Sequence, residues 1–388
     1  MKKAISLILA CAVGLTCLLS GCGNKANGSE AENPIKVGLL YSLSGVTSVS
    51  EKQLYNGTKL AIDEINANGG IHGRKIQTVF ADYASDPARA ADKARKLILD
   101  DKVAAIIGTC SSSARKAVKP VVESNHSLLV YPQSYEGQEK SSNIIYAGCI
   151  PNQQAELFVQ WLLKNVGKKF FLIGCDFIYP QVENKLAKEY LAKNGGSVVG
   201  EEYVPYGSTD FSSILNKIKV SNPDVIYTTL TGDSNVAFYK QYSAYGLKAT
   251  IASLTTNETV LKAIGSDASR NSYICVDYFK NVQNTANQKF VKDYSEKIKD
   301  GTEPSYAVMG GYNSGLFLGA AMKKAKDPTN TQQVLDAFNG LTIDSPSGKI
   351  SIDSSNHHAS LYCRIGKVDN SGEIHVIYQS ANTIAPKP

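Results

Sequence analysis

The side chains of this sequence that could do chemistry are hydroxyls and amides placed directly after apolar runs. The run 103–107 (VAAII) is followed by Gly108, which lets the chain turn, and then by Cys110 and the three serines 111–113. The run is typical of a strand buried in a parallel sheet, and the residues after the serines have helical spacing. A serine here caps that helix and also places its hydroxyl at the carboxyl end of a strand, where small ligands bind in open α/β sheets.

The same chemistry recurs after other predicted strands. Hydroxyls, aromatic rings and a few carboxylates follow strands at Ser42, 131–134, 176–179, 231–233 and 255–257. Because the carboxyl ends of parallel strands share one edge of a sheet, these groups would converge on one cleft. Such a cleft suits a small, neutral, hydrogen-bonding ligand enclosed by aromatic walls.

Motifs for catalysis are absent. The sequence has no GxSxG, GxxxxGK[ST] or GxGxxG, and nothing in it brings Cys110 and His126 together as a nucleophile and base. Paired acids such as Asp63-Glu64 and Glu201-Glu202 are typical of solvated faces, and the five histidines are scattered. We therefore expect no enzyme, no cofactor and no metal site.

The order of elements predicts an α/β fold with two doubly wound parallel-sheet lobes. Strands and helices alternate from Ile35 to about Cys149, and the same alternation restarts after Pro151. After Asn281 helices come first and short strands last, so the helices are expected to return to the first sheet and the strands to the second lobe. The prediction is lobe 1 from 34–151 and 281–343 and lobe 2 from 152–280 and 344–388. Three crossings, near Pro151, Lys280 and Asp344, would form the hinge.

The N-terminus predicts export. Lys2 and Lys3 precede an apolar stretch, 4–19, and the motif Leu19-Ser20-Gly21-Cys22 follows. Residues 1–21 have the pattern of a signal peptide. The motif resembles a bacterial lipobox, in which the cysteine is lipidated, and 22–33 would then be a flexible tether. We expect the folded part to lie on the extracytoplasmic face of the cell membrane, anchored through Cys22.

Charge and cysteine content exclude other classes. The net charge is only +6 and its positive residues are dispersed, which disfavours nucleic acid as a partner. The five cysteines beyond the N-terminal segment, with no CxxC spacing, are expected to be buried free thiols, although no disulfide can be assigned from sequence: Cys110, Cys149, Cys175, Cys275 and Cys363.

Several of these segments resemble one family. The order IKVGLLYSLSG, NGGIHGRKI, DPARAADKARKLI and VAAIIGTCSSSARKAV, from Ile35 onward, is similar to type I periplasmic substrate-binding proteins of ABC importers. Loop segments such as Tyr135-Glu136-Gly137 and 151–154 (PNQQ) look like the urea and short-chain amide binders of that class. The resemblance covers essentially all of 35–388 and implies ABC permease subunits as partners.

Carried over by position, the resemblance implies a set of ligand contacts. Cys110 stands where those relatives carry an aromatic residue, which would enlarge the pocket, and Gln133 replaces a smaller residue. Phe177 stands where the amide sensors of the class have tyrosine. The candidate ligand-binding residues are Ser42, Cys110, Ser111, Ser112, Tyr131, Gln133, Phe177, Tyr179, Thr231, Asp233 and Thr256.

Two alternatives stay open. One is a binder of branched-chain or other amino acids from the same importer class, which needs an acid for the ligand's ammonium; only Asp233 or Glu258 could serve. The other is an extracellular sensory module that uses the same cleft. The leading prediction is a lipid-anchored binding protein that captures urea or a short-chain amide.

Overall fold

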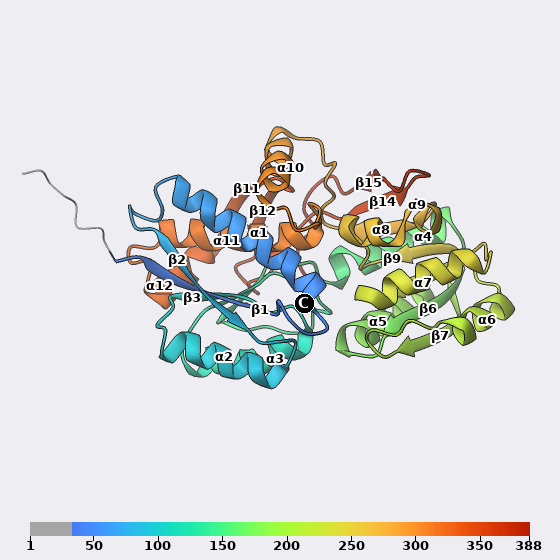
Figure 1. The fold of residues 1–388 in the computed structure, drawn as a ribbon, viewed down its shortest axis with the longest axis horizontal. Helices are drawn as coiled ribbons and strands as arrows, with labels where there is room; N and C mark the ends of the chain where they lie inside the picture. Colours follow the sequence, from blue (N-terminus) through green and yellow to red (C-terminus); the bar gives the residue numbers. More distant parts are fainter. Residues whose placement is uncertain (1–32) are drawn as a thin grey trace, which may run out of the picture. The chain divides into compact units, whose positions relative to one another are not determined.

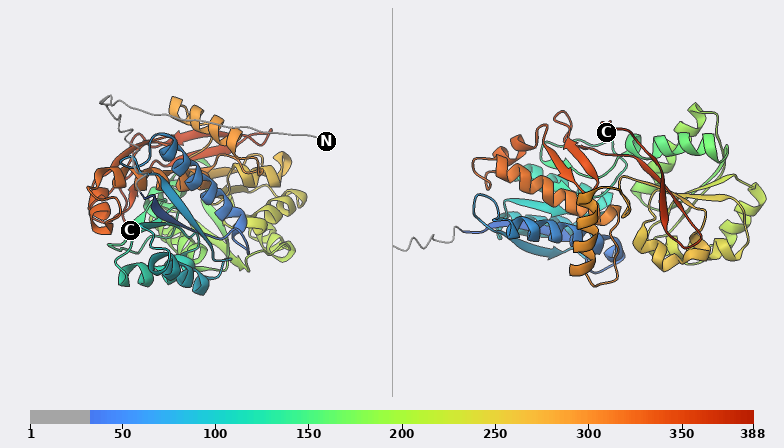
Figure 2. Two further views of the ribbon diagram at one scale, coloured as in Figure 1. Left: turned by 60° about the vertical axis from the view of Figure 1, so that its left-hand side comes forward. Right: turned by 90° about the horizontal axis from the view of Figure 1, so that it is seen from above.

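The computed structural model describes residues 33–388, which form one compact unit. The predicted signal peptide (1–21), Cys22 and nearly all of the predicted tether lie outside the described residues. In the described part, two lobes each consist of a sheet covered by helices, as predicted (Figures 1 and 2). No helix within 33–388 is both long enough and apolar enough to cross a membrane.

The first lobe is built on a five-stranded parallel sheet. Its spatial order is β2 (Ile76–Asp82), β1 (Ile35–Tyr41), β3 (Ala105–Gly108), β4 (Leu129–Tyr131) and β5 (Ile144–Tyr146). β1 pairs in register with both neighbours, so Leu39 lies between Phe80 and Ile107. Strands 1, 3 and 4 are buried on both faces, which is why they appear as continuous apolar runs.

Helices cover both faces of this sheet. α2 (Pro87–Leu99) and α3 (Ser112–Ser124) pack on one face through side chains such as Leu97 and Val118. α1 (Ser48–Ala67) and α11 (Tyr306–Lys324) cover the other face, as Figure 1 shows. α1 and α11 can approach closely because Gly57 has no side chain. A Cβ at this position would lie only 1.9 Å from the carbonyl oxygen of Val308. The predicted return of the late helices to the first sheet is confirmed for α11.

The second lobe contains a seven-stranded mixed sheet. Its order is β15 (Ile374–Gln379), β14 (Arg364–Val368), β10 (Tyr273–Val276), β9 (Thr250–Ser253), β8 (Val225–Thr229), β6 (Lys169–Cys175) and β7 (Ser197–Val204). The strands from β10 to β7 are parallel, and β14 and β15 run antiparallel at one edge.

Helices of the second lobe also lie on both faces. One face carries α4 (Ala155–Asn165) and α5 (Ile178–Lys193), and the short helix η1 (Pro151–Gln153) leads into α4. The other face carries α6 (Ser212–Ser221), α7 (Gly232–Ala244), α8 (Glu258–Ile264) and α9 (Ser266–Ser269). α8 and α9 are too short to show periodicity in the sequence.

A small third sheet lies between the last helices and the last strands. It pairs β11 (Thr342–Ser345), β12 (Gly348–Ile352) and β13 (Ala359–Ser360) antiparallel, after α10 (Thr285–Lys297) and α12 (Thr331–Phe338). β12, one of the late strands expected to return to the second lobe, pairs with β11 and β13 in this separate sheet. The chain rejoins the seven-stranded sheet at β14. The lobe boundaries near Pro151, Lys280 and Asp344 stay predictions.

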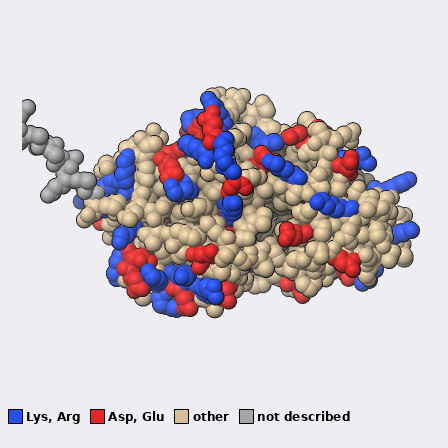
Figure 3. All heavy atoms as spheres, viewed as in Figure 1, with Lys and Arg blue, Asp and Glu red and all other residues tan. Residues whose placement is uncertain are grey.

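The surface carries charges of both signs. Figure 3 shows Lys and Arg interspersed with Asp and Glu on the face in view, especially around α2 and α10. The five cysteines of the described residues are free thiols, and four of them are buried while Cys110 is half-buried. Their predicted free state is therefore confirmed.

Candidate functional site

A cavity of about 220 Å³ lies between the two lobes. Lobe 1 contributes loops that follow β1, β2, β3 and β4, and lobe 2 contributes the loops after β6, β7, β8 and β9. The start of α11 completes the wall with Tyr306 and Ala307. The other lining residues are Val46, Thr47, Ser50, Ser85, Cys110, Ser111, Ser112, Ser113, Gln133, Ser134, Phe177, Tyr179, Tyr206, Thr231, Gly232, Leu254, Thr255, Asn257 and Val260.

The turn between β3 and α3 brings its side chains to the cavity through an unusual backbone. Gly108 has φ +154, and a Cβ there would lie 2.1 Å from the carbonyl oxygen of Leu40. Thr109 follows with φ +59, a left-handed conformation that is rare for a β-branched residue. Ser111 then caps α3 by accepting a hydrogen bond of 3.2 Å from the backbone N–H of Ala114. This turn presents Cys110 and the serines to the cavity.

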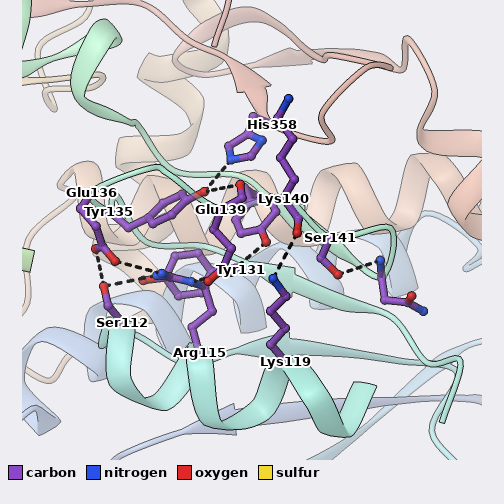
Figure 4. Close-up of polar contacts among 12 residues, drawn as sticks. Ser112, Arg115, Lys119, Tyr131, Tyr135, Glu136, Glu139, Lys140, Ser141 and His358 are labelled. Carbon is purple, nitrogen blue, oxygen red and sulfur yellow. Dashed lines mark hydrogen bonds and ion pairs between the residues drawn. The ribbon is translucent and has the colours of Figure 1, made fainter. Parts of the chain in front are cut away.

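A buried network lies directly behind Ser112 (Figure 4). The Ser112 hydroxyl donates to Glu136 Oε2 at 2.6 Å, and Arg115 Nη1 donates to Ser112 Oγ at 3.3 Å. Arg115 also pairs with Glu136 Oε1 and Glu139 Oε1, each at 3.1 Å. Its guanidinium lies 4.2 Å from the ring centroid of Tyr135. The charges are thus buried but mutually satisfied, which fixes the position of Ser112.

A second buried carboxylate supports the loop after β1. Glu51 Oε1 accepts from the hydroxyl of Thr47 and from that of Tyr83, each at 2.5 Å. Its Oε2 accepts from the backbone N–H of Ser42 at 2.7 Å. Burial raises the pKa of Glu51 to about 7, although these three donors favour its ionised form. Only Thr47 of this group reaches the cavity.

No side chain that carries a charge at neutral pH lines the cavity. The lining set contains no Asp, Glu, Lys, Arg or His. Burial raises the pKa of Cys110 and of Tyr179 well above their ordinary values, and burial also raises that of Tyr206. These groups are therefore neutral, and the site can offer hydrogen bonds and apolar contact but no ion pair of its own.

Seven of the eleven predicted site residues line the cavity. They are Cys110, Ser111, Ser112, Gln133, Phe177, Tyr179 and Thr231. They come from four different strand ends of the two lobes, which is the arrangement that the strand-end rule predicts.

The structure places the other four predicted residues away from the cavity. Tyr131 is fully buried and its hydroxyl donates to the carbonyl oxygen of Cys110 at 2.6 Å. Ser42 is buried and its Oγ accepts from the N–H of Ser85 at 2.7 Å. Thr256 donates to Ser253 Oγ at 2.7 Å within lobe 2. Asp233 is exposed in the first turn of α7, where it complements the helix dipole.

Several lining residues were absent from the predicted set. Thr47 and Ser85 lie in loops after β1 and β2, so the strand-end rule alone could have found them. Tyr206 follows β7 in the turn Pro205-Tyr206-Gly207 and could have been found in the same way. Tyr306 comes from the start of α11, and no local pattern in the sequence points from there to the cleft.

A metal or catalytic centre has no support in this part of the chain. Within 33–388, no group of three or more His, Cys, Asp or Glu residues could hold a metal ion. Cys110 and His126 lie at opposite ends of α3, with His126 two residues beyond its last turn.

The protein combines two lobes with a cleft at the strand ends whose lining is uncharged. The family described as "Periplasmic binding protein domain" matches residues 35–388, and the chain belongs to this family. It is similar to "Leu/Ile/Val-binding protein homolog 7" of Brucella abortus (strain 2308), with 26% identity over 95% of this chain and 97% of the relative. It is also 25% identical to "Leu/Ile/Val-binding protein BraC3" of Rhizobium johnstonii, over 86% of this chain and 92% of the relative.

Solved structures have the same fold. A solute-binding protein of an ABC transporter from R. palustris, in complex with benzoate, has a TM-score of 0.83 at 21% identity, covering 91% of this chain and 98% of its own. The branched-chain amino acid transporter substrate-binding protein LivJ from Streptococcus pneumoniae, in complex with isoleucine, has a TM-score of 0.80 at 23% identity, covering 91% and 100%. The family match and these structures agree that the chain has the fold of a periplasmic binding protein.

Proposed function

We propose that this protein captures a small neutral polar ligand, urea or a short-chain amide, between its lobes and delivers it to an ABC permease. One observation carries the proposal: the lining residues include hydroxyls, amides and aromatic rings but no charged side chain. A neutral ligand can satisfy its hydrogen bonds there without burying an unpaired charge. The seven cavity-lining candidates, from Cys110 to Thr231, are proposed as its contacts.

The uncharged lining disfavours the amino-acid alternative. A bound amino acid would bury its ammonium, which needs a carboxylate close by. Asp233 and Glu258 both lie outside the cavity lining, and Glu258 Oε1 accepts from the backbone N–H of Lys280 at 2.8 Å. The carboxylate that an amino-acid binder requires is therefore missing from the wall of this cavity.

The size of the cavity favours the larger members of the amide class. Its volume of about 220 Å³ exceeds the roughly 150 Å³ that holds a benzene ring in an apolar protein cavity. Urea alone would leave much of that space to water, whereas propionamide or isobutyramide would fill more of it. Cys110, a half-buried residue of the wall, has a small side chain and so leaves space for the ligand.

A second candidate ligand is an aromatic monocarboxylate. The observation in its favour is the start of α3, where free backbone N–H groups and three serines lie at the cavity. The relative from R. palustris is bound to benzoate. This candidate needs no partner for an ammonium group, but it places a carboxylate against an otherwise uncharged wall.

A thermal-shift panel tests the proposed function. Urea, acetamide, propionamide, benzoate and isoleucine should be added separately at millimolar concentration to the purified chain. A ligand present at 100 times its Kd stabilises the folded state by about 2.7 kcal/mol. A rise in Tm with an amide, and none with isoleucine, is the expected result. A rise in Tm with isoleucine alone would contradict the proposal.

The anchor and the importer role are part of the same proposal. Cys22, which lies outside the described residues, is proposed as the lipidated residue. Mass spectrometry of the membrane fraction should find a diacylated N-terminal cysteine, and Cys22→Ala should release the protein. Deletion of the gene should abolish uptake of the ligand; intact uptake with lost signalling would favour the sensory alternative instead.

A further inference from the structure

The hydroxyl of Ser112 has its hydrogen committed to the protein interior. Glu136 is paired with Arg115 at 3.1 Å, so it is ionised and can only accept hydrogen bonds. The Ser112 hydroxyl must therefore be the donor in its 2.6 Å contact with Glu136 Oε2. Arg115 Nη1 occupies one of the two Ser112 lone pairs at 3.3 Å. Only the remaining lone pair of Ser112 is left for a ligand.

An independent cluster commits the hydroxyls of Thr47 and Ser85 in the same way. Thr47 donates to Glu51 Oε1 at 2.5 Å. Its single hydrogen is then used, so the 2.7 Å contact between Thr47 and Ser85 has Ser85 as the donor. Ser85 Oγ also accepts from the backbone N–H of Thr47 at 3.0 Å. Both residues line the cavity, and each hydroxyl oxygen has one lone pair left for a ligand.

We propose that the buried carboxylates Glu136 and Glu51 set the hydrogen-bond polarity of the cleft, so that Ser112, Thr47 and Ser85 accept hydrogen bonds from N–H groups of the ligand. Glu136 and Glu51 act as positioning residues, because neither lines the cavity. The wall they support selects ligands with exposed N–H donors. It works against a carboxylate, which can only accept.

This inference rests on the proposed function and sharpens it. Among neutral ligands it separates primary amides and ureas, which carry N–H groups, from fully N-alkylated amides, which carry none. It also argues against the aromatic monocarboxylate, because the carboxylate would meet lone pairs on three hydroxyls. An uncharged lining alone does not make either distinction.

A pair of isomers provides a matched test on the unmodified protein. Isobutyramide and N,N-dimethylacetamide contain the same atoms and have similar volumes, but only isobutyramide has N–H groups. Calorimetry at pH 8, where Glu51 is mostly ionised, should give at least about tenfold tighter binding of isobutyramide. Equal affinities for the two isomers would overturn the inference while leaving the proposed function in place.

Two variants test the role of Glu136. In Glu136→Gln the amide nitrogen can donate to Ser112 and release the serine hydrogen toward the cavity, so the ratio of the two affinities should fall toward one. Glu139→Gln is the matched control, because Glu139 pairs with Arg115 at 3.1 Å but contacts neither Ser112 nor the cavity. It should keep the ratio of the unmodified protein.

The outcomes are separable. An unchanged ratio in a folded Glu136→Gln protein, or the same fall in Glu139→Gln, would contradict the role of Glu136. If Glu136→Gln does not fold, the isomer pair on the unmodified protein still decides whether the wall accepts hydrogen bonds. If benzoate binds and none of urea, acetamide and isobutyramide does, both the proposed function and this inference are contradicted.

Discussion

Arg115 is the residue whose loss should damage lobe 1 most. Its side chain is fully buried, pairs with Glu136 and Glu139, and lies against the rings of Tyr131 and Tyr135. Burial opposes its charge, but Tyr131, Glu136 and Glu139 raise its pKa above the ordinary value. Arg115→Met would keep much of the packing and leave two buried carboxylates without their cation.

The expected loss can be worked out from these contacts. Removing one partner of a buried ion pair costs about 3–5 kcal/mol. Glu136 would keep its bond from Ser112, and Glu139 would keep its 2.9 Å bond from Tyr146, so the lower end, about 3 kcal/mol, is expected. For a unit spanning 33–388, an unfolding entropy of about 2.1 cal/mol/K per residue then gives a fall in Tm of about 4 °C.

The assay is thermal unfolding followed by circular dichroism, with Arg89→Met as the control. Arg89 lies on the exposed side of α2, and its loss should change Tm by less than about 1 °C. Adding Glu136→Gln and Glu139→Gln to Arg115→Met removes the unpaired charges and should restore at least half of the loss. A single Arg115→Met protein as stable as its parent would refute the reasoning, and so would a triple variant with no recovery.

Two further predictions concern pH and cavity size. Burial raises the pKa of Glu183 to about 8 and those of Glu51 and Glu258 to about 7, so the folded state holds protons that the unfolded state has released. The free energy of unfolding should therefore fall as pH rises from 6.5 to 8.5, by up to about 1.4 kcal/mol per pH unit for each group. When Tm is measured across this pH range, Glu183→Gln should show a smaller decrease than the unmodified protein. Burial lowers the pKa of His358 to about 4, so His358 makes stability rise with pH, but only below pH 6.5. A rise in Tm between pH 6.5 and 8.5 would contradict the raised pKa values of the three glutamates. Cys110→Trp should fill part of the 220 Å³ cavity. In calorimetry it should therefore weaken the binding of isobutyramide more than the binding of urea, by about tenfold or more. Equal weakening of both would show that Cys110 does not limit the size of the ligand.

The local signals of the first lobe were strong enough to predict its elements. The strand Ile35–Tyr41 coincides with the apolar run IKVGLLY, and Asp86 caps α2 by accepting from the N–H of Arg89 at 2.9 Å. Apolar runs, caps and turn glycines are short-range features, so sequence spacing records them. The start of α1 at Ser48 is harder to predict, because its first turn is mostly polar and shows no helical periodicity.

The sequence predicted which loops form the site, but it did not predict which side chains of those loops reach the cavity. The strand-end rule gives the segment, whereas the direction of a side chain depends on contacts across the sheet. Tyr131 turns inward because Cys110 offers a carbonyl acceptor 2.6 Å from its hydroxyl, and no pattern in the sequence shows that contact. Glu51 falls within a helical segment and, like most acids there, would be expected on a solvated face, but it is fully buried beneath Ser42, Thr47 and Tyr83.

The most direct test of the account is isothermal titration of one preparation at pH 8 with propionamide, isoleucine and benzoate in turn. The account predicts saturable binding of propionamide in the micromolar range, and binding at least a hundredfold weaker, about 2.7 kcal/mol, for the two carboxylates. Tighter binding of isoleucine or benzoate than of propionamide would contradict the claim that an uncharged, hydrogen-bond-accepting cleft selects an amide.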